Sequence, residues 1–307
     1  MTILADTNTR ILIQGITGRE AATFTAESLQ YGARIVAGVT PGKQGSSVHG
    51  VAVYDTVAAA VRDHPCDATV ISVPARFALD AALEALAHGI RLLVIVTERI
   101  PRRDVAALLE AAESAGARVI GPNSLGVISP GKTRVGMAGG DADAVRQAYM
   151  PGRVGVISRS GGMMTEIANL LTQAGIGQST CVSIGGDPLI GSTLLDLLPL
   201  YEADPETEAL VLFCEPGGVM EERLAGHLKQ QGSRLPVVAF VAGRFADRMQ
   251  GIRFGHAGAM VQGSQGSPAA KIAALREAGV YVADRLSQVP LLVRAAIDGR
   301  GEPAVRP

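Results

Sequence analysis

The sequence has no tryptophan, and aromatic residues make up only 4% of its 307 positions. It also has no apolar run that approaches the roughly 18 residues of a membrane-spanning helix. The N-terminus lacks a basic region followed by an apolar core, which is the pattern of a secretory leader. We therefore expect a cytoplasmic protein that does not associate with a membrane.

Cysteine is scarce as well. The three cysteines, Cys66, Cys181 and Cys214, lie far apart, and each falls in or near an apolar stretch. No CxxC pair and no Cys/His cluster is present, so we expect neither a zinc site nor any other metal site. Separated cysteines in odd number favour buried thiols in a reducing compartment over disulfides.

An excess of one charge is also missing. The 28 basic and 29 acidic residues leave a net charge of −1, which favours neither nucleic acid nor an anionic membrane as a partner. Hydrophobic residues, by contrast, make up 47% of the chain, and glycine occurs 37 times. The length and the apolar content predict two domains, and the many glycines are typical of tight turns in an α/β protein.

Short β-branched runs alternate with Ala/Leu-rich helical runs along the chain. The first half has expected strands at 10–15, 34–39, 68–73, 91–97 and 117–121, and helices such as 78–89 and 104–116 end at a glycine. The second half has expected strands at 153–158, 179–184, 209–214, 236–241 and 280–283. Strand and helix alternating at this pitch predict parallel sheets with helices on both faces.

A polar, glycine-rich stretch without clear periodicity interrupts this alternation. We therefore expect an N-terminal Rossmann-like domain at 1–130, a connection at 131–152 and a C-terminal flavodoxin-like domain at 153–307. The two halves are alike in architecture but not in sequence.

Three turns follow strands at one edge of the first expected sheet. The turn "QGITGRE" at 14–20 opens a helix, where backbone N–H groups and the helix dipole hold a phosphate well. Thr17 replaces the middle glycine of the GxGxxG fingerprint, which argues against an NAD-dependent oxidoreductase. The turns "GVTPGKQG" at 38–45, with Lys43, and "VTER" at 96–99 complete the set. Together they favour a ligand with phosphates and an adenine, although tight packing alone explains any one of them.

Two turns of the second half also carry candidate chemistry. The stretch "SRSGGM" at 158–163 places hydroxyls and glycines at a helix N-terminus, which is an anion site by geometry. Glu215, in "CEPGG" at 214–218, stands at the end of another strand. Its alternative role is that of an ordinary carboxylate at a helix start.

His256 lies among small residues in "GHAGAM", after a loop with three arginines. Gly251, Gly255 and Gly258 give this loop the freedom that a moving segment needs. A histidine acts as a nucleophile toward phosphorus when a carboxylate orients its second ring nitrogen, and Glu215 is the candidate. A structural histidine with a nearby hydrogen-bond partner is the alternative.

These stretches occur together in one known family. "QGITG", "AGVTPGK", "VTE", "GPN", "GVISPG", "VGVISRSG", "GIGQSTCVSIGGDP", "DPETEALV", "CEPGG" and "GHAGAM" follow one another along the chain. In order and spacing the sequence resembles the alpha subunit of succinyl-CoA synthetase, the nucleotide-forming succinate–CoA ligase. The resemblance extends from about Ile3 to about Ile297.

The resemblance implies a role for each matching residue. His256 matches the phosphohistidine, and Glu215 matches the carboxylate that orients it. The matching coenzyme A (CoA) contacts are Thr17, Gly18, Arg19, Glu20, Lys43, Val96, Thr97, Glu98 and Asn123. The matching phosphate contacts are Ser158, Ser160, Gly161 and Gly162, and the positions at the acid substrate are Ser124 and Thr165.

The resemblance also implies partners. CoA is a substrate, and ATP or GTP with Mg²⁺ is bound by a separate beta subunit of the ATP-grasp type, in an αβ or α2β2 assembly of the tricarboxylic acid cycle. Ser124 and Leu125 depart from the family's Cys-Pro, and Thr165 replaces a tyrosine. The acid pocket is therefore altered, so that malate, sulfoacetate or a similar small acid stays an alternative to succinate. A CoA-sensing paralogue without catalysis is the rival in another class, and the intact His256 and Glu215 argue against it.

Overall fold

A computed structural model describes residues 3–245, 256 and 266–299. The chain divides into two compact units. The first contains Leu4–Arg146 and Ser183–Ser192, and the second contains Gln147–Val182 and the chain from Thr193 onward. The short segment Ser183–Ser192 thus belongs to the unit that precedes it in the sequence.

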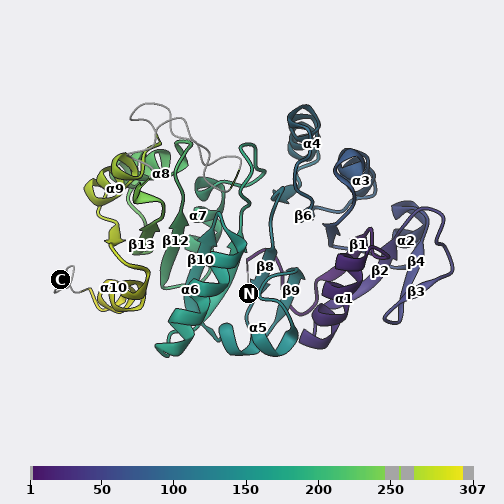
Figure 1. The fold of residues 1–307 in the computed structure, drawn as a ribbon, viewed down its shortest axis with the longest axis horizontal. Helices are drawn as coiled ribbons and strands as arrows, with labels where there is room; N and C mark the ends of the chain where they lie inside the picture. The colour runs from purple at the N-terminus through teal and green to yellow at the C-terminus, as the bar shows by residue number, and fades with distance from the viewer. Residues whose placement is uncertain (1–2, 246–255, 257–265, 300–307) are drawn as a thin grey trace. The chain divides into compact units, whose positions relative to one another are not determined.

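The first unit is built on a parallel sheet whose strands are ordered β3-β4-β2-β1-β5-β6-β7 (Figure 1). Only the short β3 runs antiparallel to its neighbour β4. If β3 is set aside and the other six strands are numbered along the chain, their order across the sheet is 3-2-1-4-5-6, as in Rossmann folds. The strands are β1 (Arg10–Gln14), β2 (Arg34–Val39), β3 (Ser47–Val48), β4 (Val51–Tyr54), β5 (Ala68–Ile71), β6 (Leu92–Ile95) and β7 (Arg118–Ile120).

Helices cover both faces of this sheet, which explains why β5 and β6 are buried along their whole length. In Figure 1, α3 and α4 lie on one side of the sheet and α1 on the other. A hairpin and a further helix follow the last strand. These elements are α1 (Arg19–Tyr31), α2 (Val57–Asp63), the 3-10 helix η1 (Ala75–Phe77), α3 (Ala78–Ala87), α4 (Arg102–Ser114), β8 (Gly126–Ser129), β9 (Thr133–Gly136) and α5 (Ala142–Ala148).

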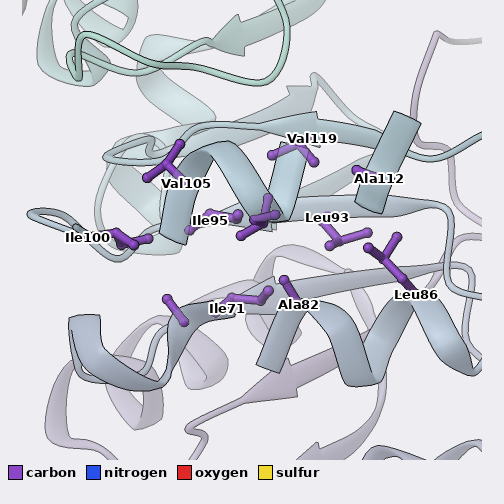
Figure 2. Packing of buried hydrophobic residues seen from close by; sticks show 11 residues of the cluster. Ile71, Ala82, Leu86, Leu93, Ile95, Ile100, Val105, Ala112 and Val119 are labelled. Carbon is purple, nitrogen blue, oxygen red and sulfur yellow. The ribbon is translucent and has the colours of Figure 1, made fainter. Parts of the chain in front are cut away.

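The core between α3, α4 and the sheet consists of aliphatic side chains at helical and strand spacing (Figure 2). Ala82 and Leu86 of α3 meet Leu93 and Ile95 of β6, and Val105 of α4 closes the layer. Small alanines on α3 let the helix approach the sheet closely, so that the larger strand residues fill the remaining space.

The second unit has a parallel sheet with the order β14-β13-β12-β10-β11. Counted along the chain from β10, this is the 2-1-3-4-5 order of flavodoxin-like folds. The strands are β10 (Pro151–Ser158), β11 (Gln178–Ser183), β12 (Ala209–Cys214), β13 (Val237–Val241) and β14 (Tyr281–Ala283). The helices are α6 (Gly161–Gln173), α7 (Leu194–Ala203), α8 (Met220–Gln231), α9 (Pro268–Glu277), the 3-10 helix η3 (Leu286–Gln288) and α10 (Val289–Ile297).

The structure confirms the expected α/β class and places a strand at each range where the sequence predicts one. The boundaries drawn at residues 130 and 153 stay predictions about domain organisation. The stretch expected as a connection contains regular structure, β9 and α5. Within the described part of the chain, no helix has both the length and the apolar character needed to cross a membrane.

The packing in Figure 2 predicts which leucines matter for stability. Leu93 is fully buried in the core, whereas Leu83 of α3 is 41% exposed. We expect Leu93→Ala to lower the free energy of unfolding by about 2–5 kcal/mol, because it leaves a cavity in a close-packed layer. Leu83→Ala should change it by no more than about 0.5 kcal/mol. Urea unfolding of both variants measures this, and equal effects would contradict the packing described here.

Candidate active site

The strand order of the first unit reverses between β1 and β5, where parallel sheets open a crevice at their carboxyl edge. The turn after β1 begins with Gly15, whose φ is +83°. A Cβ on this residue would lie 2.2 Å from the carbonyl oxygen of Ser72, which follows β5. Only glycine fits there, because the two strand ends approach each other so closely.

A hollow of about 520 Å³ lies at this reversal point. Most of the residues expected to contact CoA line it: Gly18, Arg19, Glu20, Val96, Thr97, Glu98 and Asn123. Thr97 fixes the backbone of Val73, which also lines this hollow. Its hydroxyl donates to the carbonyl oxygen of Val73 at 2.8 Å and accepts from the N–H of Val73 at 3.2 Å.

A second hollow of about 530 Å³ shares Val73 and Pro74 with the first. Its wall includes Val39, Pro41 and the ring of Phe77, so it is the more apolar of the two. Phe77 is 47% exposed, although phenylalanine is among the residues that are most often buried. An apolar hollow joined to a polar one suits a long ligand with an aromatic end and a charged part.

Two of the expected CoA contacts lie outside the lining of both hollows. Thr17 donates its hydroxyl hydrogen bond to Thr40, which lines the second hollow, at 3.2 Å. Lys43 lies in the turn after β2, where its N–H donates to a carboxylate oxygen of Asp55 at 2.9 Å. Both turns stand at the carboxyl edge of the sheet, so the assignment of these residues to CoA stays a prediction.

Asn123 is held in a defined orientation at the rim of the first hollow. It has a φ of +55°, and its N–H donates to the carbonyl oxygen of Thr97 at 3.1 Å. Its side-chain amide donates to Asp187 at 3.1 Å. Asp187 is 9% exposed and comes from the Ser183–Ser192 segment, which the first unit incorporates. No signal in the sequence indicates Asp187, because no spacing rule connects it with Asn123.

Ser124 also lines the first hollow, but its hydroxyl is engaged within the protein. It donates to the carbonyl oxygen of Ser183 at 2.5 Å and accepts from the N–H of Gly126 at 2.8 Å. The side chain is 2% exposed. This serine therefore fixes the turn, and its assignment to the acid substrate stays a prediction.

In the second unit, His256 and Glu215 meet as the sequence predicts. The Nδ1 atom of His256 lies 2.8 Å from Oε2 of Glu215. The glutamate side chain is 11% exposed and the histidine side chain 31%, so the pair is shielded but reachable. Of the expected moving loop, Arg244 is described and pairs with Asp284 at 3.0 Å. Residues 246–255 and 257–265, with the other two arginines and the glycines of this loop, lie outside the described part of the chain.

The expected phosphate site stands beside this pair, because Ser158 of β10 is in register with Phe213 of β12. Ser160 caps α6 and accepts from the N–H of Met163. Among the described residues, no atom lies within 4 Å of the position that a Cβ would take on Gly162. Backbone N–H groups at such a helix start attract anions.

Arg159 is a charged residue of this turn whose role the sequence alone does not indicate. It is 5% exposed and extends toward the turn after Glu215. Its Nη1 atom lies 4.0 Å from the position that a Cβ would take on Gly218. A buried guanidinium between the two turns adds positive potential where an anion would bind.

Thr165, the other residue expected at the acid substrate, is on α6. Its hydroxyl lies 2.9 Å from the hydroxyl of Tyr149, which is 2% exposed. A tyrosine from the segment before β10 thus contacts the residue that stands at the family's tyrosine position in the sequence. The sequence could not indicate this, because the two residues belong to different elements.

Comparison with known proteins bears on both halves of the chain. The CoA binding domain family matches residues 6–99, and the CoA-ligase family matches residues 157–281. Succinate–CoA ligase (ADP-forming) subunit alpha 1 of Archaeoglobus fulgidus is 47% identical over 96% of this chain and 98% of its own length. The chain belongs to the family of succinate–CoA ligase alpha subunits.

Other relatives and structural neighbours of this chain are named for different acids. A subunit of the ADP-forming sulfoacetate–CoA ligase of Bilophila wadsworthia is 40% identical over 97% of this chain and the whole of its own length. ATP citrate lyase from Methanosaeta concilii, solved with (3S)-citryl-CoA, has a TM-score of 0.90 at 28% identity. That match covers 99% of this chain and 53% of the longer lyase chain.

As a member of this family, the chain is part of an acid–CoA ligase and has a CoA-binding domain. The matched residues 6–99 include the turn after β1 and most of the lining of both hollows. The matched residues 157–281 include the α6 start, Glu215 and His256. Within the described residues, no group of three or more His, Cys, Asp or Glu side chains is arranged to hold a metal ion.

None of the three thiols lines either hollow. Burial raises the pKa of the Cys66 thiol to about 11 and holds the pKa of Cys181 and of Cys214 far above the ordinary range. All three are therefore protonated at neutral pH. Cys214 directly precedes Glu215 and serves as a neutral, fully buried neighbour of that carboxylate.

These pKa values predict how the thiols react with iodoacetamide. Cys66 should react slowly at pH 7.5, and its rate should rise roughly tenfold per pH unit up to about pH 11, because only the thiolate is nucleophilic. Cys181 and Cys214 should stay unlabelled until the chain unfolds. Mass spectrometry of the labelled chain measures this, with the urea-unfolded chain as control. Rapid labelling of Cys214 in the folded chain would contradict its burial.

Proposed function

We propose that this chain is the phosphoryl-carrying alpha subunit of an acid–CoA ligase and that His256 is its transiently phosphorylated residue. The observation that carries the proposal is the 2.8 Å contact between Nδ1 of His256 and Glu215 at the end of β12. A carboxylate that accepts the Nδ1 proton leaves the Nε2 lone pair as the nucleophile and stabilises the positive charge that develops on the ring.

The reaction then has three displacements. Nε2 attacks the terminal phosphorus of the nucleoside triphosphate, and the bond to the diphosphate oxygen breaks. A carboxylate oxygen of the acid attacks the same phosphorus, the N–P bond breaks, and an acyl phosphate forms. The CoA thiolate attacks the acyl carbon, and inorganic phosphate leaves with its bonding electrons. Positioning and positive potential supply most of the catalysis in phosphoryl transfer.

The second unit offers both requirements around His256. The α6 N-terminus, with Ser158, Ser160, Gly161 and Gly162, would hold the phosphoryl oxygens through backbone N–H groups and the helix dipole. The buried Arg159 would add a full positive charge. Glu215 keeps the imidazole oriented throughout, so that the same nitrogen receives and releases the phosphoryl group.

CoA would occupy the two joined hollows of the first unit. The apolar hollow with Phe77 suits the adenine, and the polar hollow with Arg19 and Asn123 suits the phosphates and the pantetheine arm. The amide of Asn123, fixed by Asp187, would face the end of that arm near its sulfur.

The acid is a small carboxylate, succinate or a close relative. Relatives of this chain are named for succinate and for sulfoacetate at similar identity. Thr165 and Ser124 replace family residues beside the expected acid position, and both hydroxyls are engaged with other protein groups. A changed donor set in that pocket affects specificity more than it affects phosphoryl transfer.

The remaining components would come from a separate beta subunit that binds ATP or GTP with Mg²⁺, in an αβ or α2β2 complex. We place this complex in the cytoplasm and, for succinate, in the tricarboxylic acid cycle. A CoA sensor without catalysis would need neither a nucleophilic imidazole nor a carboxylate aligned with it, which is why the ligase is the preferred function.

Phosphorylation of His256 is tested directly with γ-labelled ATP and Mg²⁺ on the co-expressed αβ complex. We expect acid-labile, base-stable label on this chain, and none in His256→Asn, because an amide is no nucleophile toward phosphorus. Glu215→Gln should slow labelling at least about tenfold, since the neutral amide does not stabilise the positive charge that develops on the ring as a carboxylate does.

The matched control is Glu166→Gln, which removes an exposed carboxylate from α6 of the same unit. It should label at the wild-type rate. Persistent label in His256→Asn would show that another residue carries the phosphoryl group.

The acid substrate is tested by the kcat/KM of the αβ complex for succinate, malate and sulfoacetate. We expect succinate to be used and at least one hydroxylated or sulfonated acid to match or exceed it, because the donors around Thr165 differ from those of the family pattern. His256 labelling without any acid is the control, since it does not involve the acid pocket. A preference for succinate over every other acid of about a hundredfold or more would mean that these substitutions do not alter specificity.

A further inference from the structure

Lys271 of α9 is a fully buried lysine, and it is not used in the proposed chemistry. Its ammonium group donates to the carbonyl oxygen of Gly218 at 3.0 Å and to Glu222 at 3.1 Å, and it forms an ion pair with the buried Glu221. All three of its N–H donors therefore have acceptors. A lysine is almost never fully buried unless it is paired in this way.

The acceptor Gly218 belongs to the turn that carries Glu215. A second contact fixes the same turn, because the N–H of Gly217 donates to the carbonyl oxygen of Gly266 at 2.8 Å. Gly266 has a φ of +73°, and a Cβ on it would lie 2.7 Å from the oxygen of Gly218. The start of α9 thus holds the turn after Glu215 through one backbone and one side-chain anchor.

The arrangement is not the one that stability alone would favour. Among the residues that the structure describes, Oε1 of Glu221 and Oε1 of Glu222 are buried without a hydrogen-bond partner. Removing a lysine and carboxylates from water costs several kcal/mol per ion, and apolar side chains of similar volume often replace such pairs without loss. The cluster therefore contributes a defined geometry rather than extra stability.

Its charges also act at the end of β12. The charges of Glu221, Lys271 and Glu215 all influence the pKa of the Cys214 thiol, which burial raises. Without Lys271, the negative charges of Glu221 and Glu222 would be left unopposed close to the turn that follows Glu215.

We propose that Lys271 is a positioning residue, which holds the Glu215 turn so that its carboxylate stays aligned with Nδ1 of His256. The inference rests on the proposed phosphorylation of His256. Lys271 does not touch a substrate; it acts through Gly218 and the turn. Its loss should slow phosphoryl transfer to His256 and leave CoA binding in the first unit unchanged.

The first test removes both charges of the buried pair in Lys271→Met/Glu221→Gln, so that no carboxylate of that pair is left unpaired. We expect the αβ complex to phosphorylate His256 at least about tenfold more slowly in a single turnover. The KM for CoA should stay within about twofold of wild type, since the hollows lie in the other unit.

The matched control is Lys229→Met/Glu277→Gln. This pair also joins α8 to α9, but at the surface, with side chains 43% and 68% exposed. It should leave both the phosphorylation rate and the KM for CoA unchanged. A phosphorylation rate within about twofold of wild type in Lys271→Met/Glu221→Gln would overturn the proposal, and so would failure of that variant to fold, because Lys271 would then be a stability residue.

The second test moves the turn without touching the charges. Gly266→Ala places a methyl group against Gly218, and it should likewise slow phosphorylation at unchanged KM for CoA. Gly279→Ala, with a φ of +78° and open space around the added Cβ, imposes the same backbone strain elsewhere on the chain and should have no such effect. Equal effects of the two alanines would contradict the anchoring role.

The outcome for the wild-type complex separates the two proposals. If wild-type His256 takes no label from ATP, the proposed function itself fails. If it takes label and the Lys271 and Gly266 variants label equally fast, only the positioning role of Lys271 fails.

Discussion

The reversal of strand order in each sheet is the constraint on which both sites depend. Where the order reverses, the connections from two adjacent strands leave toward opposite faces, so a crevice opens at the carboxyl edge. In the first unit this point lies between β1 and β5, and the hollows occupy it. In the second unit it lies between β10 and β12, whose ends carry the α6 start and Glu215. The two candidate sites therefore lie at equivalent points of two different folds.

Each unit also uses a fully buried cation to hold a segment next to its site. In the first unit, Arg134 donates to the carbonyl oxygens of Ala138 at 2.9 Å and Gly140 at 2.6 Å. This fixes the segment that brings Met137 to the first hollow. In the second unit, Lys271 holds the turn after Glu215. A charge in the core is costly, so it is typical of places where a loop must keep one conformation.

The two hydroxyls beside the expected acid position are also held by contacts within the protein. Ser124 and Thr165 depart from the family's cysteine and tyrosine, and both hydroxyls are engaged with protein groups. The space and the hydrogen-bond donors available to an acid then depend on the neighbours of Ser124 and Thr165 as well as on these two side chains. Such a site would separate the identity of the acid from the phosphoryl chemistry that we propose for His256 and Glu215, which lie 2.8 Å apart.

By itself, the sequence determined the α/β class, the positions of most strands, though not of β3, β4, β8 and β9, and the pairing of His256 with Glu215. The alternation of strand and helix patterns and the glycines at turns are local signals, so the sequence shows them directly. The carboxyl ends of parallel strands meet at one edge of the sheet, whatever loops connect them. Only the tertiary structure decided that Ser183–Ser192 joins the first unit, that Asp187 holds Asn123, that Tyr149 reaches Thr165 and that Lys271 lies under the Glu215 turn. These are contacts between residues far apart in the chain, and no local pattern encodes them, because packing of whole elements brings the side chains together.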